Sequence, residues 1–292
     1  MRAIGIGDNV CDKYLHQQTM YPGGQALNFA VYAGMLGVPS AYLGVFGTDA
    51  VAQHVQQTLD ECGVDRSHCR QYSGENGYAM VNLVDGDRVF LGSNKGGVLR
   101  EHPIQLDEAD LAYIKEFQLC HTTNNSYMDE QLPRLKETGI ALSYDFSGQW
   151  TDEDRVDRVA PYVDYAFLSC GSVEMEQAQE ICRKIHDKGA GMVIATRGSK
   201  GAVLFDGTDF YPQPPQLVEA VDTLGAGDSF ATAFLLSWTK SSLEYGDKLK
   251  QDKALRAKLL KQALEQAAEF SAKTCLVYGA FGKGTAIPDS QN

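Results

Sequence analysis

Short β-favouring runs alternate with longer segments of helical period along nearly the whole chain. The predicted strands cover residues 3–7, 40–45, 119–122, 141–146, 163–168 and 191–196. The predicted helices cover residues 26–36, 49–62, 128–138, 151–160 and 173–187. Strands that alternate with helices build a parallel sheet with helices on both faces. The pattern therefore predicts an α/β fold of three layers, with a doubly wound and mostly parallel sheet in the middle.

Two stretches depart from this alternation. Residues 77–92 contain two strand-like runs around the turn Asp85-Gly86-Asp87, which is typical of an antiparallel hairpin. With the polar segment at 16–21, this hairpin is expected to form a small sheet that covers a site. A second hairpin is predicted at 202–211. Residues 226–275 are predicted to be mostly helical, with a solvated, charged insertion at 245–261.

The composition is that of a globular protein. Of the 292 residues, 43% are hydrophobic and 22% are charged, and 26 Lys and Arg against 38 Asp and Glu give a formal charge of −12. This balance excludes a disordered polyelectrolyte. It also argues against nucleic acid as a partner, because phosphate backbones are bound by clusters of Lys and Arg. The length alone allows one large α/β domain or two smaller domains.

The sequence shows no segment that points to export or to a membrane. The first apolar run ends at Asp8, too early for a signal peptide, and no later run approaches the ~18 apolar residues needed to cross a bilayer. The seven cysteines are odd in number, widely spaced and without a C-x-x-C pair. We therefore expect reduced thiols and a cytoplasmic protein.

The strongest chemical signal is the segment 222–228, which lies between a β-like run at 217–221 and an apolar run of helical spacing. The first N–H groups of a helix have no intrahelical partner and lie at the positive end of its dipole. Gly225, Ala226 and Gly227 leave room for a phosphoryl group to approach them. Asp228 beside such an anion site is placed to take a proton from a hydroxyl. The alternative is that Asp228 only caps the helix and the glycines only form a turn.

A second cluster carries groups that suit a sugar. Gly23 and Gly24 precede the first long helix and allow a ligand to approach the backbone. Asn28 offers both donors and an acceptor to neighbouring hydroxyl groups. Asp8 and Asp12 follow the first strand, where open α/β sheets bind their ligands, although both also fit a turn.

The loop 196–201 follows a predicted strand and supplies a hydroxyl, two cations and two glycines, a set that suits a triphosphate. Other nucleotide signatures are missing. The chain has no G-x-x-x-x-G-K-[ST] motif, and Val10 stands where a dinucleotide fingerprint starting at Gly5 needs a glycine. The six histidines show no metal-ligand spacing. The sequence therefore predicts neither Walker-type nor Rossmann chemistry, nor a histidine metal site.

Three motifs, in this order, resemble those of the ribokinase family of carbohydrate kinases, also called the PfkB family. They are Gly23-Gly24-x-Ala26-x-Asn28, Thr196-x-Gly198-x-x-Gly201 and Asp222-Thr223-x-Gly225-Ala226-Gly227-Asp228. The resemblance implies one ribokinase-like domain over residues 1–292, with a small β-sheet lid from segments near 9–22 and 77–97. It also implies phosphoryl transfer from ATP, with Mg²⁺, to a hydroxyl of a small sugar substrate.

The resemblance implies a role for each motif residue. The catalytic residues would be Asp228 as general base and, as anion hole, Gly225, Ala226 and Gly227. ATP would be bound by Thr196, Gly198, Gly201, Gly225 and Gly227. The sugar would be bound by Asp12, Gly24 and Asn28, with Asp8 and Gly23 beside them. Glu174 would contact hydrated magnesium, although Gly171 replaces the Asn of the family motif Asn-x-x-Glu, and a K⁺-like cation would lie near Asp222.

Within the family, the segments 6–14, 23–32, 87–90 and 145–150 look most like those of fructoselysine 6-kinases. Those enzymes phosphorylate O6 of the Amadori adduct of lysine and glucose. The amino-acid tail of that substrate needs contacts beyond the sugar. Candidates on the expected lid are Tyr14, His16, Arg88, Asn94 and Lys95.

Several activities stay open at this point. Ribokinase, fructokinase, 2-keto-3-deoxygluconate kinase and nucleoside kinase share the motifs, and a sugar- or nucleotide-binding protein that has lost transfer would keep the fold. A lid with an exposed strand edge would be protected by pairing with a second copy, so we expect a homodimer through the lid.

Overall fold

The computed structural model describes residues 1–84 and 87–288, with side chains outside 83–89. Its larger sheet has the strand order β13-β12-β11-β10-β9-β8-β1-β4-β5. The strands are β1 (Ala3–Gly7), β4 (Ser40–Phe46), β5 (Arg70–Gln71), β8 (Leu119–Thr123), β9 (Ala141–Asp145), β10 (Tyr165–Ser169), β11 (Met192–Thr196), β12 (Ala202–Phe205) and β13 (Phe210–Gln213). The strands from β11 to β5 run parallel, and β12 and β13 pair antiparallel at one edge.

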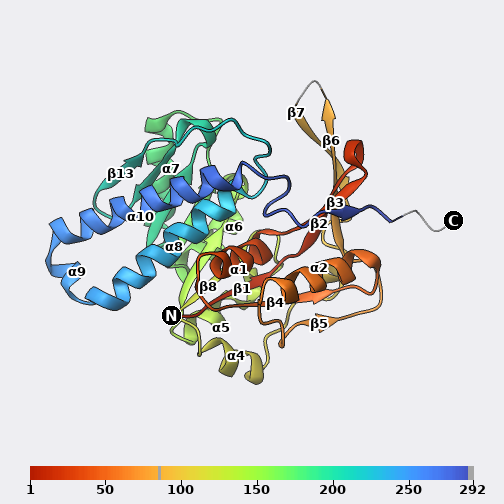
Figure 1. Ribbon diagram of the computed structural model, residues 1–292. Coiled ribbons are helices and arrows are strands. Elements are labelled where there is room, and N and C mark those ends of the chain that lie inside the picture. The colour runs from red at the N-terminus through yellow and green to blue at the C-terminus, as the bar shows by residue number, and fades with distance from the viewer. Residues whose placement is uncertain (85–86, 289–292) are drawn as a thin grey trace.

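Helices cover both faces of this sheet (Figure 1). The helices are α1 (Gln25–Met35), α2 (Ala50–Glu61), α3 (Val98–Glu101), α4 (Glu108–Ile114), α5 (Leu132–Glu137), α6 (Glu153–Val159), α7 (Met175–Asp187), α8 (Ala226–Tyr245), α9 (Lys248–Gln251) and α10 (Lys253–Thr274). One face packs against α1, α8 and α10 through residues such as Phe29, Phe234 and Leu264. The other packs against α5, α6 and α7 through Leu132, Val156 and Ile185. The three layers predicted from the sequence are confirmed.

Helix α1 shows how the sequence sets this packing. Residues 26–33 of α1 are buried on every side of the helix, because it lies between the sheet, α2 and α8. A helix in such a place must be apolar all round, and its alanines keep it thin enough to fit. By contrast, α2 meets solvent on one face and is capped by Asp49, whose side chain accepts a hydrogen bond from the backbone N–H of Ala52.

A second sheet projects from the first, at the upper right of Figure 1. It has the order β14-β3-β2-β6-β7, with β2 (Val10–Tyr14), β3 (Thr19–Gly23), β6 (Gly77–Val84), β7 (Asp87–Ser93) and β14 (Thr285–Ala286). Strand β2 pairs antiparallel with β3 and parallel with β6, and β6 pairs antiparallel with β7. The predicted pairing of the segments near 9–22 and 77–97 is therefore present. Asp85 and Gly86 of the predicted turn lie outside the described residues.

The β-like run at 217–221 is not a strand, which corrects the sequence-based prediction. Pro214 and Pro215 come just before it and cannot donate to a strand ladder, and the segment pairs with no described strand. Its apolar side chains are left exposed, 72% for Leu217 and 48% for Val221. Leu217, Val218 and Ala220 of this segment line a pocket instead.

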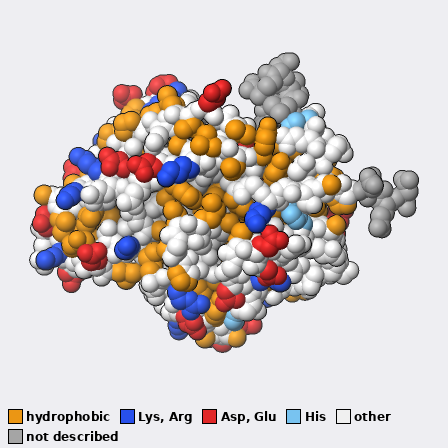
Figure 2. Space-filling view, in the orientation of Figure 1, with side chains coloured by type: hydrophobic (Ala, Val, Ile, Leu, Met, Phe, Trp, Pro, Cys, Tyr) orange, Lys and Arg blue, Asp and Glu red, His pale blue; other side chains and the backbone are white. Residues whose placement is uncertain are grey.

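The charged stretch 245–261, predicted within a mostly helical region, is itself helical. It contains the end of α8, all of α9 and the start of α10, with Leu249 and Leu260 packed inward. In Figure 2, basic and acidic side chains are intermixed over this part of the molecule, at the left, so its outer face is solvated as expected. All seven cysteines carry free thiols. Among the helices of residues 1–84 and 87–288, none has the length and apolar character needed to cross a membrane.

Candidate active site

The segment 222–228 forms the tight turn at which α8 begins. Gly225 caps the helix with φ 74°, and a Cβ there would collide with the Tyr32 hydroxyl and lie 2.8 Å from the Ala280 Cβ. This left-handed conformation and the lack of space both require glycine. The backbone N–H of Ala226 donates to the Thr223 carbonyl at 3.3 Å, whereas the N–H groups of Gly227 and Asp228 have no acceptor in the part of the chain that the structure describes. These two N–H groups are available to an anion.

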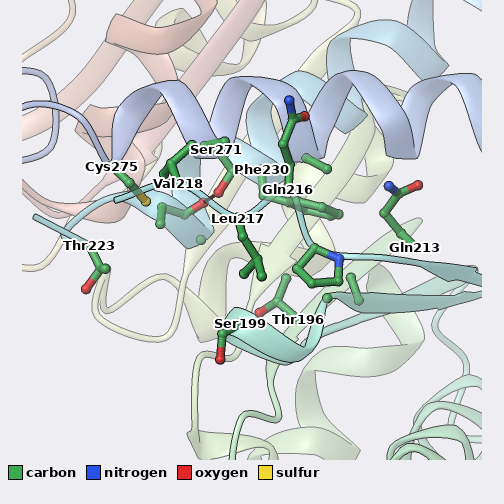
Figure 3. Close-up of a pocket in the computed structure, with 18 of the residues that line it drawn as sticks. Thr196, Ser199, Gln213, Gln216, Leu217, Val218, Thr223, Phe230, Ser271 and Cys275 are labelled. Atoms are coloured by element: carbon green, nitrogen blue, oxygen red, sulfur yellow. Dashed lines mark hydrogen bonds between the residues drawn. The ribbon is translucent and has the colours of Figure 1, made fainter. Parts of the chain in front are cut away.

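One pocket lies on the Ala226 and Gly227 side of this turn; we call it the apolar pocket, with a volume of 260 Å³. Its walls come from the loop after β11, the irregular segment after β13, α8 and α10. In Figure 3, Thr196 and Ser199 lie on one side and Phe230, Ser271 and Cys275 on the other, with Leu217 between them. The lining residues are Thr196, Gly198, Ser199, Gly201, Ala202, Gln213, Pro214, Pro215, Gln216, Leu217, Val218, Ala220, Thr223, Ala226, Gly227, Phe230, Ala268, Ser271, Ala272 and Cys275.

A second pocket lies on the Gly225 and Asp228 side of the turn; we call it the polar pocket, with a volume of 620 Å³. The second sheet forms one wall, and the carboxyl ends of strands of the large sheet form its floor. The lining residues are Asp8, Val10, Asp12, Gly24, Gln25, Asn28, Tyr78, Ala79, Phe90, Ser93, Lys95, Gly96, Asn124, Asn125, Tyr127, Ser147, Gln149, Arg155, Leu224, Gly225 and Asp228. The turn thus separates an apolar pocket from a polar one.

Asp228 is half-buried between α8 and α1. Its Oδ2 accepts a hydrogen bond of 2.6 Å from Asn28 Nδ2. Burial raises the pKa of the Asp228 carboxyl to about 6, the Asn28 amide opposes this rise, and the charge of Asp8 adds to it. The Oδ1 of Asn28 is buried and has no hydrogen-bond partner among the described residues. A carboxylate with such a pKa exchanges protons near neutral pH. The Asn28 Oδ1 atom is available to accept a hydrogen bond from a ligand.

The predicted sugar-binding residues around Asp8 lie together at the N-terminus of α1. The Asp8 carboxylate accepts hydrogen bonds from the backbone N–H of Gln25 at 2.8 Å and of Ala26 at 3.2 Å, and from the hydroxyls of Thr123 and Ser126. Asp8 therefore anchors the start of α1 as well as lining the polar pocket. Its role in binding a substrate stays a prediction.

Asp12 and the two glycines complete this corner of the polar pocket. Asp12 is 6% exposed and lines the pocket from β2. A Cβ on Gly23 would lie 2.8 Å from Asp12 Oδ2, and a Cβ on Gly24 would lie 2.7 Å from the Asp8 carbonyl oxygen. Side chains at either position would displace these carboxylate residues. Close packing therefore explains why both positions are glycine.

The loop after β11 holds the residues predicted to bind a triphosphate. Thr196, Gly198 and Gly201 all line the apolar pocket. Gly201 has φ 87°, and a Cβ there would collide with the Gln213 carbonyl oxygen of the neighbouring strand β13. Thr196 Oγ1 donates to the Leu168 carbonyl at 3.2 Å, which ties the loop to β10.

Several predicted tail-binding residues do not reach the polar pocket. The Asn94 side chain binds backbone instead, with Oδ1 accepting from Tyr78 N at 2.9 Å and Nδ2 donating to the Asn76 carbonyl at 2.7 Å. The Tyr14 hydroxyl is buried and donates to Asp222 at 2.6 Å. Arg88 belongs to β7, but its side chain lies outside the described part of the structure. Of these candidates, Lys95 does line the pocket.

The predicted metal residues lie away from both pockets' centres. Glu174 is 76% exposed at the start of α7, 3.1 Å from Lys200 Nζ, and this hydrogen bond lowers the pKa of its carboxyl. Asp222 accepts hydrogen bonds from Tyr14, from Gly279 N at 2.9 Å and from Leu224 N at 3.0 Å. Within residues 1–84 and 87–288, no three His, Cys, Asp or Glu side chains are grouped to hold a metal ion. The Mg²⁺ and K⁺ sites stay predictions.

Sequence reasoning missed Asp145 as a site residue. It ends β9, is 6% exposed and accepts a hydrogen bond of 2.6 Å from Ser147 N. Burial, and then the charge of Asp228, raise the pKa of the Asp145 carboxyl to about 7. The available signal was its place at the carboxyl end of a predicted strand, the same rule that singled out Asp8.

Arg155, Gln149 and the loop 124–127 were also missed. They line the polar pocket from helical segments and a loop whose sequence carries no motif, so only the fold brings them to the site.

Comparisons with known proteins identify relatives over nearly the full length. A family model described as pfkB family carbohydrate kinase matches residues 2–283. The chain is 42% identical to fructosamine kinase FrlD of Bacillus subtilis (strain 168), over 97% of this chain and 94% of that protein. It is 32% identical to fructoselysine 6-kinase of Escherichia coli (strain K12), over 94% of this chain and 98% of that protein.

Solved structures share the fold. The Arabidopsis thaliana ribokinase, solved with ribose and ATP, aligns with a TM-score of 0.78 and 20% identity over 97% of this chain and 94% of that chain. Aminoimidazole riboside kinase from Salmonella enterica aligns with a TM-score of 0.71 and 20% identity over 99% of this chain and 97% of that chain. The predicted ribokinase-like fold and the predicted enzyme class, an ATP-dependent carbohydrate kinase, are confirmed. With its match over residues 2–283 and a relative at 42% identity, the chain belongs to the pfkB family of carbohydrate kinases.

Proposed function

We propose that this kinase transfers the γ-phosphoryl group of ATP to O6 of fructoselysine. The observation that carries the proposal is the position of the turn at the start of α8, between the apolar and the polar pocket. A donor in one pocket and an acceptor in the other would meet at its free N–H groups. The choice of acceptor is supported by the two relatives at 42% and 32% identity, whose names are fructosamine kinase and fructoselysine 6-kinase.

The apolar pocket suits the nucleotide. Leu217, Val218 and Phe230 offer apolar surface to a nucleobase, and the loop at Thr196 to Gly201 offers backbone and hydroxyl groups to phosphates. The N–H groups of Gly227 and Asp228 and the positive end of the long helix α8 would stabilise the charge that develops on the transferring phosphoryl group.

The polar pocket suits the sugar, with Asp228 as the general base. Its carboxylate lines the pocket, Asn28 holds its Oδ2 at 2.6 Å, and its Oδ1 would take the proton of the acceptor hydroxyl. The pKa of about 6 keeps this carboxyl mainly ionised at neutral pH while still close enough to accept a proton. Catalysis would then consist mainly of in-line positioning and charge stabilisation.

The second sheet would act as a lid. It supplies Val10, Asp12, Tyr78 and Phe90 to the wall of the polar pocket, so its closure would exclude water as a competing acceptor. Mg²⁺ would neutralise the phosphate charge, with Glu174 in contact through water from the start of α7. Asp222 would lie near a K⁺ ion; its carboxylate already accepts three hydrogen bonds.

We also propose that the protein forms a homodimer through the second sheet. Strand β7 is at the edge of that sheet and leaves Phe90 60% and Leu91 51% exposed. Light scattering on the purified protein tests the assembly state, and a Leu91→Ser variant that stays as large as the parent would speak against this contact. A cytoplasmic location remains the expectation that follows from the free thiols.

The experiment that tests the proposed function is ATP consumption with Mg²⁺ and K⁺ against a panel of acceptors. The panel is fructoselysine, fructose, ribose, 2-keto-3-deoxygluconate, adenosine and no acceptor. We expect strong, selective turnover with fructoselysine, and a product whose phosphorus couples to C6 by NMR. Faster turnover of another acceptor would overturn the choice of substrate, and silence on all acceptors would favour a binding protein of this fold.

A further inference from the structure

The polar pocket contains two groups of opposite charge. Asp8, Asp12 and Asp228 supply carboxylates near the proposed phosphoryl acceptor. Two cations also line it, Lys95 from the loop after β7 and Arg155 from α6. The proposed base and sugar contacts use none of this positive charge. Arg155 already pairs with Asp129 at 3.1 Å, but two cations beside one pocket still suit a ligand that carries an acidic group.

Arg155 is held rigidly and keeps donors to spare. Its Nε lies 3.1 Å from Asp129 Oδ2, and its Nη1 donates to the Asn124 carbonyl at 3.3 Å and to Gln149 Oε1. The Tyr144 hydroxyl in turn holds Asp129 at 2.7 Å. The Nη2 group of Arg155 donates to no acceptor in residues 1–84 and 87–288. Of the five N–H donors of this guanidinium, the two on Nη2 remain for a ligand in the pocket, and the buried Nε–H, although close to Asp129, has no hydrogen-bond partner among the described residues.

Lys95, on the loop after β7, contacts the loop 124–127 at the end opposite Arg155 through a hydrogen bond from Tyr127. The Tyr127 hydroxyl donates to the Lys95 carbonyl at 2.8 Å, while Arg155 binds the Asn124 carbonyl of the loop 124–127. The backbone is left-handed at Lys95, with φ 57°, and at Tyr127, with φ 54°. Such conformations cost conformational free energy in residues other than glycine and are often found in functional loops. The Lys95 side chain is exposed, and its ammonium pairs with no described carboxylate. Both cations are therefore attached to one loop.

This loop is also connected to the sugar end of the pocket. Asn125 Nδ2 donates to Gln25 Oε1 at 3.0 Å, and the backbone N–H of Gln25 donates to Asp8 at 2.8 Å. Hydrogen bonds thus run from the cations, through the loop and Gln25, to the carboxylates. A ligand that occupies the whole pocket would carry hydroxyls and a positive amine beside the carboxylates and a negative group beside Arg155 and Lys95.

We propose that Arg155, assisted by Lys95, binds the α-carboxylate of the amino-acid part of a ketosamine substrate. The inference rests on the proposed function and names the residues that would distinguish a glycated amino acid from a free sugar. A neutral hexose has no anionic group to pair with either cation, whereas the ketosamine of an amino acid carries both a secondary ammonium and a carboxylate. Planar guanidinium and carboxylate groups match in geometry, and such charge-assisted hydrogen bonds are among the strong ones.

The test compares fructoselysine with its carboxamide, which keeps the sugar and the amines and loses only the negative charge. For the parent enzyme we expect KM for the amide to be about 5–30 times higher than for the acid, with kcat within twofold, on the usual scale of a partly exposed hydrogen bond to a charged group. Arg155→Gln should raise KM for the acid by the same factor and remove the difference between acid and amide. Arg155→Lys should restore part of it, and Lys95→Gln should show a smaller rise.

Arg158→Gln is the matched control. Arg158 lies one helical turn further along α6, also faces Asp129, at 3.9 Å, and does not line the pocket, so its loss removes the same charge without removing a ligand contact. Thermal melts of each variant show that the fold is intact. The control should leave both KM values unchanged; a control that moves them as much as Arg155→Gln would overturn the proposal in favour of a general charge effect.

Three further results would overturn the inference in different ways. If fructoselysine is a good substrate and its carboxamide is used equally well, the proposed function stands and the carboxylate site fails. If a sugar phosphate is turned over and Arg155→Gln abolishes that activity, the anion is a phosphate and not a carboxylate. If the parent enzyme phosphorylates no ketosamine, the proposed function is wrong, and so is the carboxylate site that rests on it.

Discussion

The two pockets that meet at the start of α8 are built from the chain in opposite ways. All residues of the apolar pocket come from 196–275, the last third of the sequence, whereas the polar pocket draws on residues from Asp8 to Asp228. The first is assembled by consecutive elements, from β11 to α10. The second requires the ends of several strands, the second sheet and α6 to come together. A local motif therefore describes the proposed donor side well, and the proposed acceptor side depends on the whole fold.

The largest difference between the two pockets should come from Asp228→Asn. Without the carboxylate, the acceptor hydroxyl loses its base, and we expect kcat to fall about 10²–10⁴-fold. The KM for ATP should change little, because Asp228 lines the polar pocket and not the apolar one. Steady-state kinetics with both substrates measure this split. Glu244→Gln, a neutralised exposed carboxylate on the same helix, is the control, and unchanged turnover in Asp228→Asn would remove the residue from its proposed role.

Gly225→Ala tests whether the shared turn must keep its shape. An alanine at φ 74° costs about 1–2 kcal/mol, and its Cβ would collide with the Tyr32 hydroxyl. We expect kcat to drop about 10–10²-fold as the anion-binding N–H groups move, and the melting temperature to fall.

Gly227→Ala provides the stability control for that variant. No atom lies within 4 Å of a Cβ placed on Gly227, and its φ is outside the left-handed region. Its melting temperature should match that of the parent. If both variants melt alike, the argument from backbone conformation at Gly225 is wrong.

Leu217→Ser acts on the apolar pocket alone. Removing most of an exposed leucine side chain from the wall should raise KM for ATP about 3–10-fold, through lost apolar contact with the nucleobase, and leave the KM for the sugar unchanged. Val221→Ser, four residues further along and outside both pockets, is the matched control. An equal effect on the sugar KM would show that the two pockets do not act as separate sites.

The same contrast explains which parts of the site the sequence predicts. Gly225 and Gly201 are predicted because each has a backbone conformation that glycine favours. A glycine at such a turn can be recognised from the local sequence alone. The parallel strands β1, β4, β8, β9, β10 and β11 are predicted because their buried runs are short and alternate with helices. Arg155 and Asn124 are not predicted, since neither belongs to a motif and their meeting depends on how α6 packs beside the end of β8.

At two other positions the structure differs from what the residue types suggest, for a different physical reason. The run at 217–221 has the apolar residues of a strand, but two prolines precede it and its side chains face a pocket. Asn94 has the chemistry of a ligand contact, but the hairpin's own backbone takes up both ends of its amide. Residue type alone does not show whether a polar group is free to bind a ligand.

The smallest expected effect concerns stability rather than rate, and it comes from Asp145, a buried carboxyl whose charge interacts with that of Asp228 but which does not line the polar pocket. Burial and the charge of Asp228 raise the pKa of Asp145 from 3.8 to about 7, so the folded protein holds this proton more tightly than the unfolded chain. The stability that this carboxyl contributes is present below about pH 4 and is lost as the pH rises to about 7. Asp145→Asn keeps an acceptor for Ser147 N and removes the charge. It should therefore melt like the parent at pH 4 and be more stable at pH 8, by about 1–3 kcal/mol. Calorimetric melts at the two pH values measure the change, and a variant that is less stable than the parent at pH 8 would show that the Asp145 carboxylate is favourable in the fold.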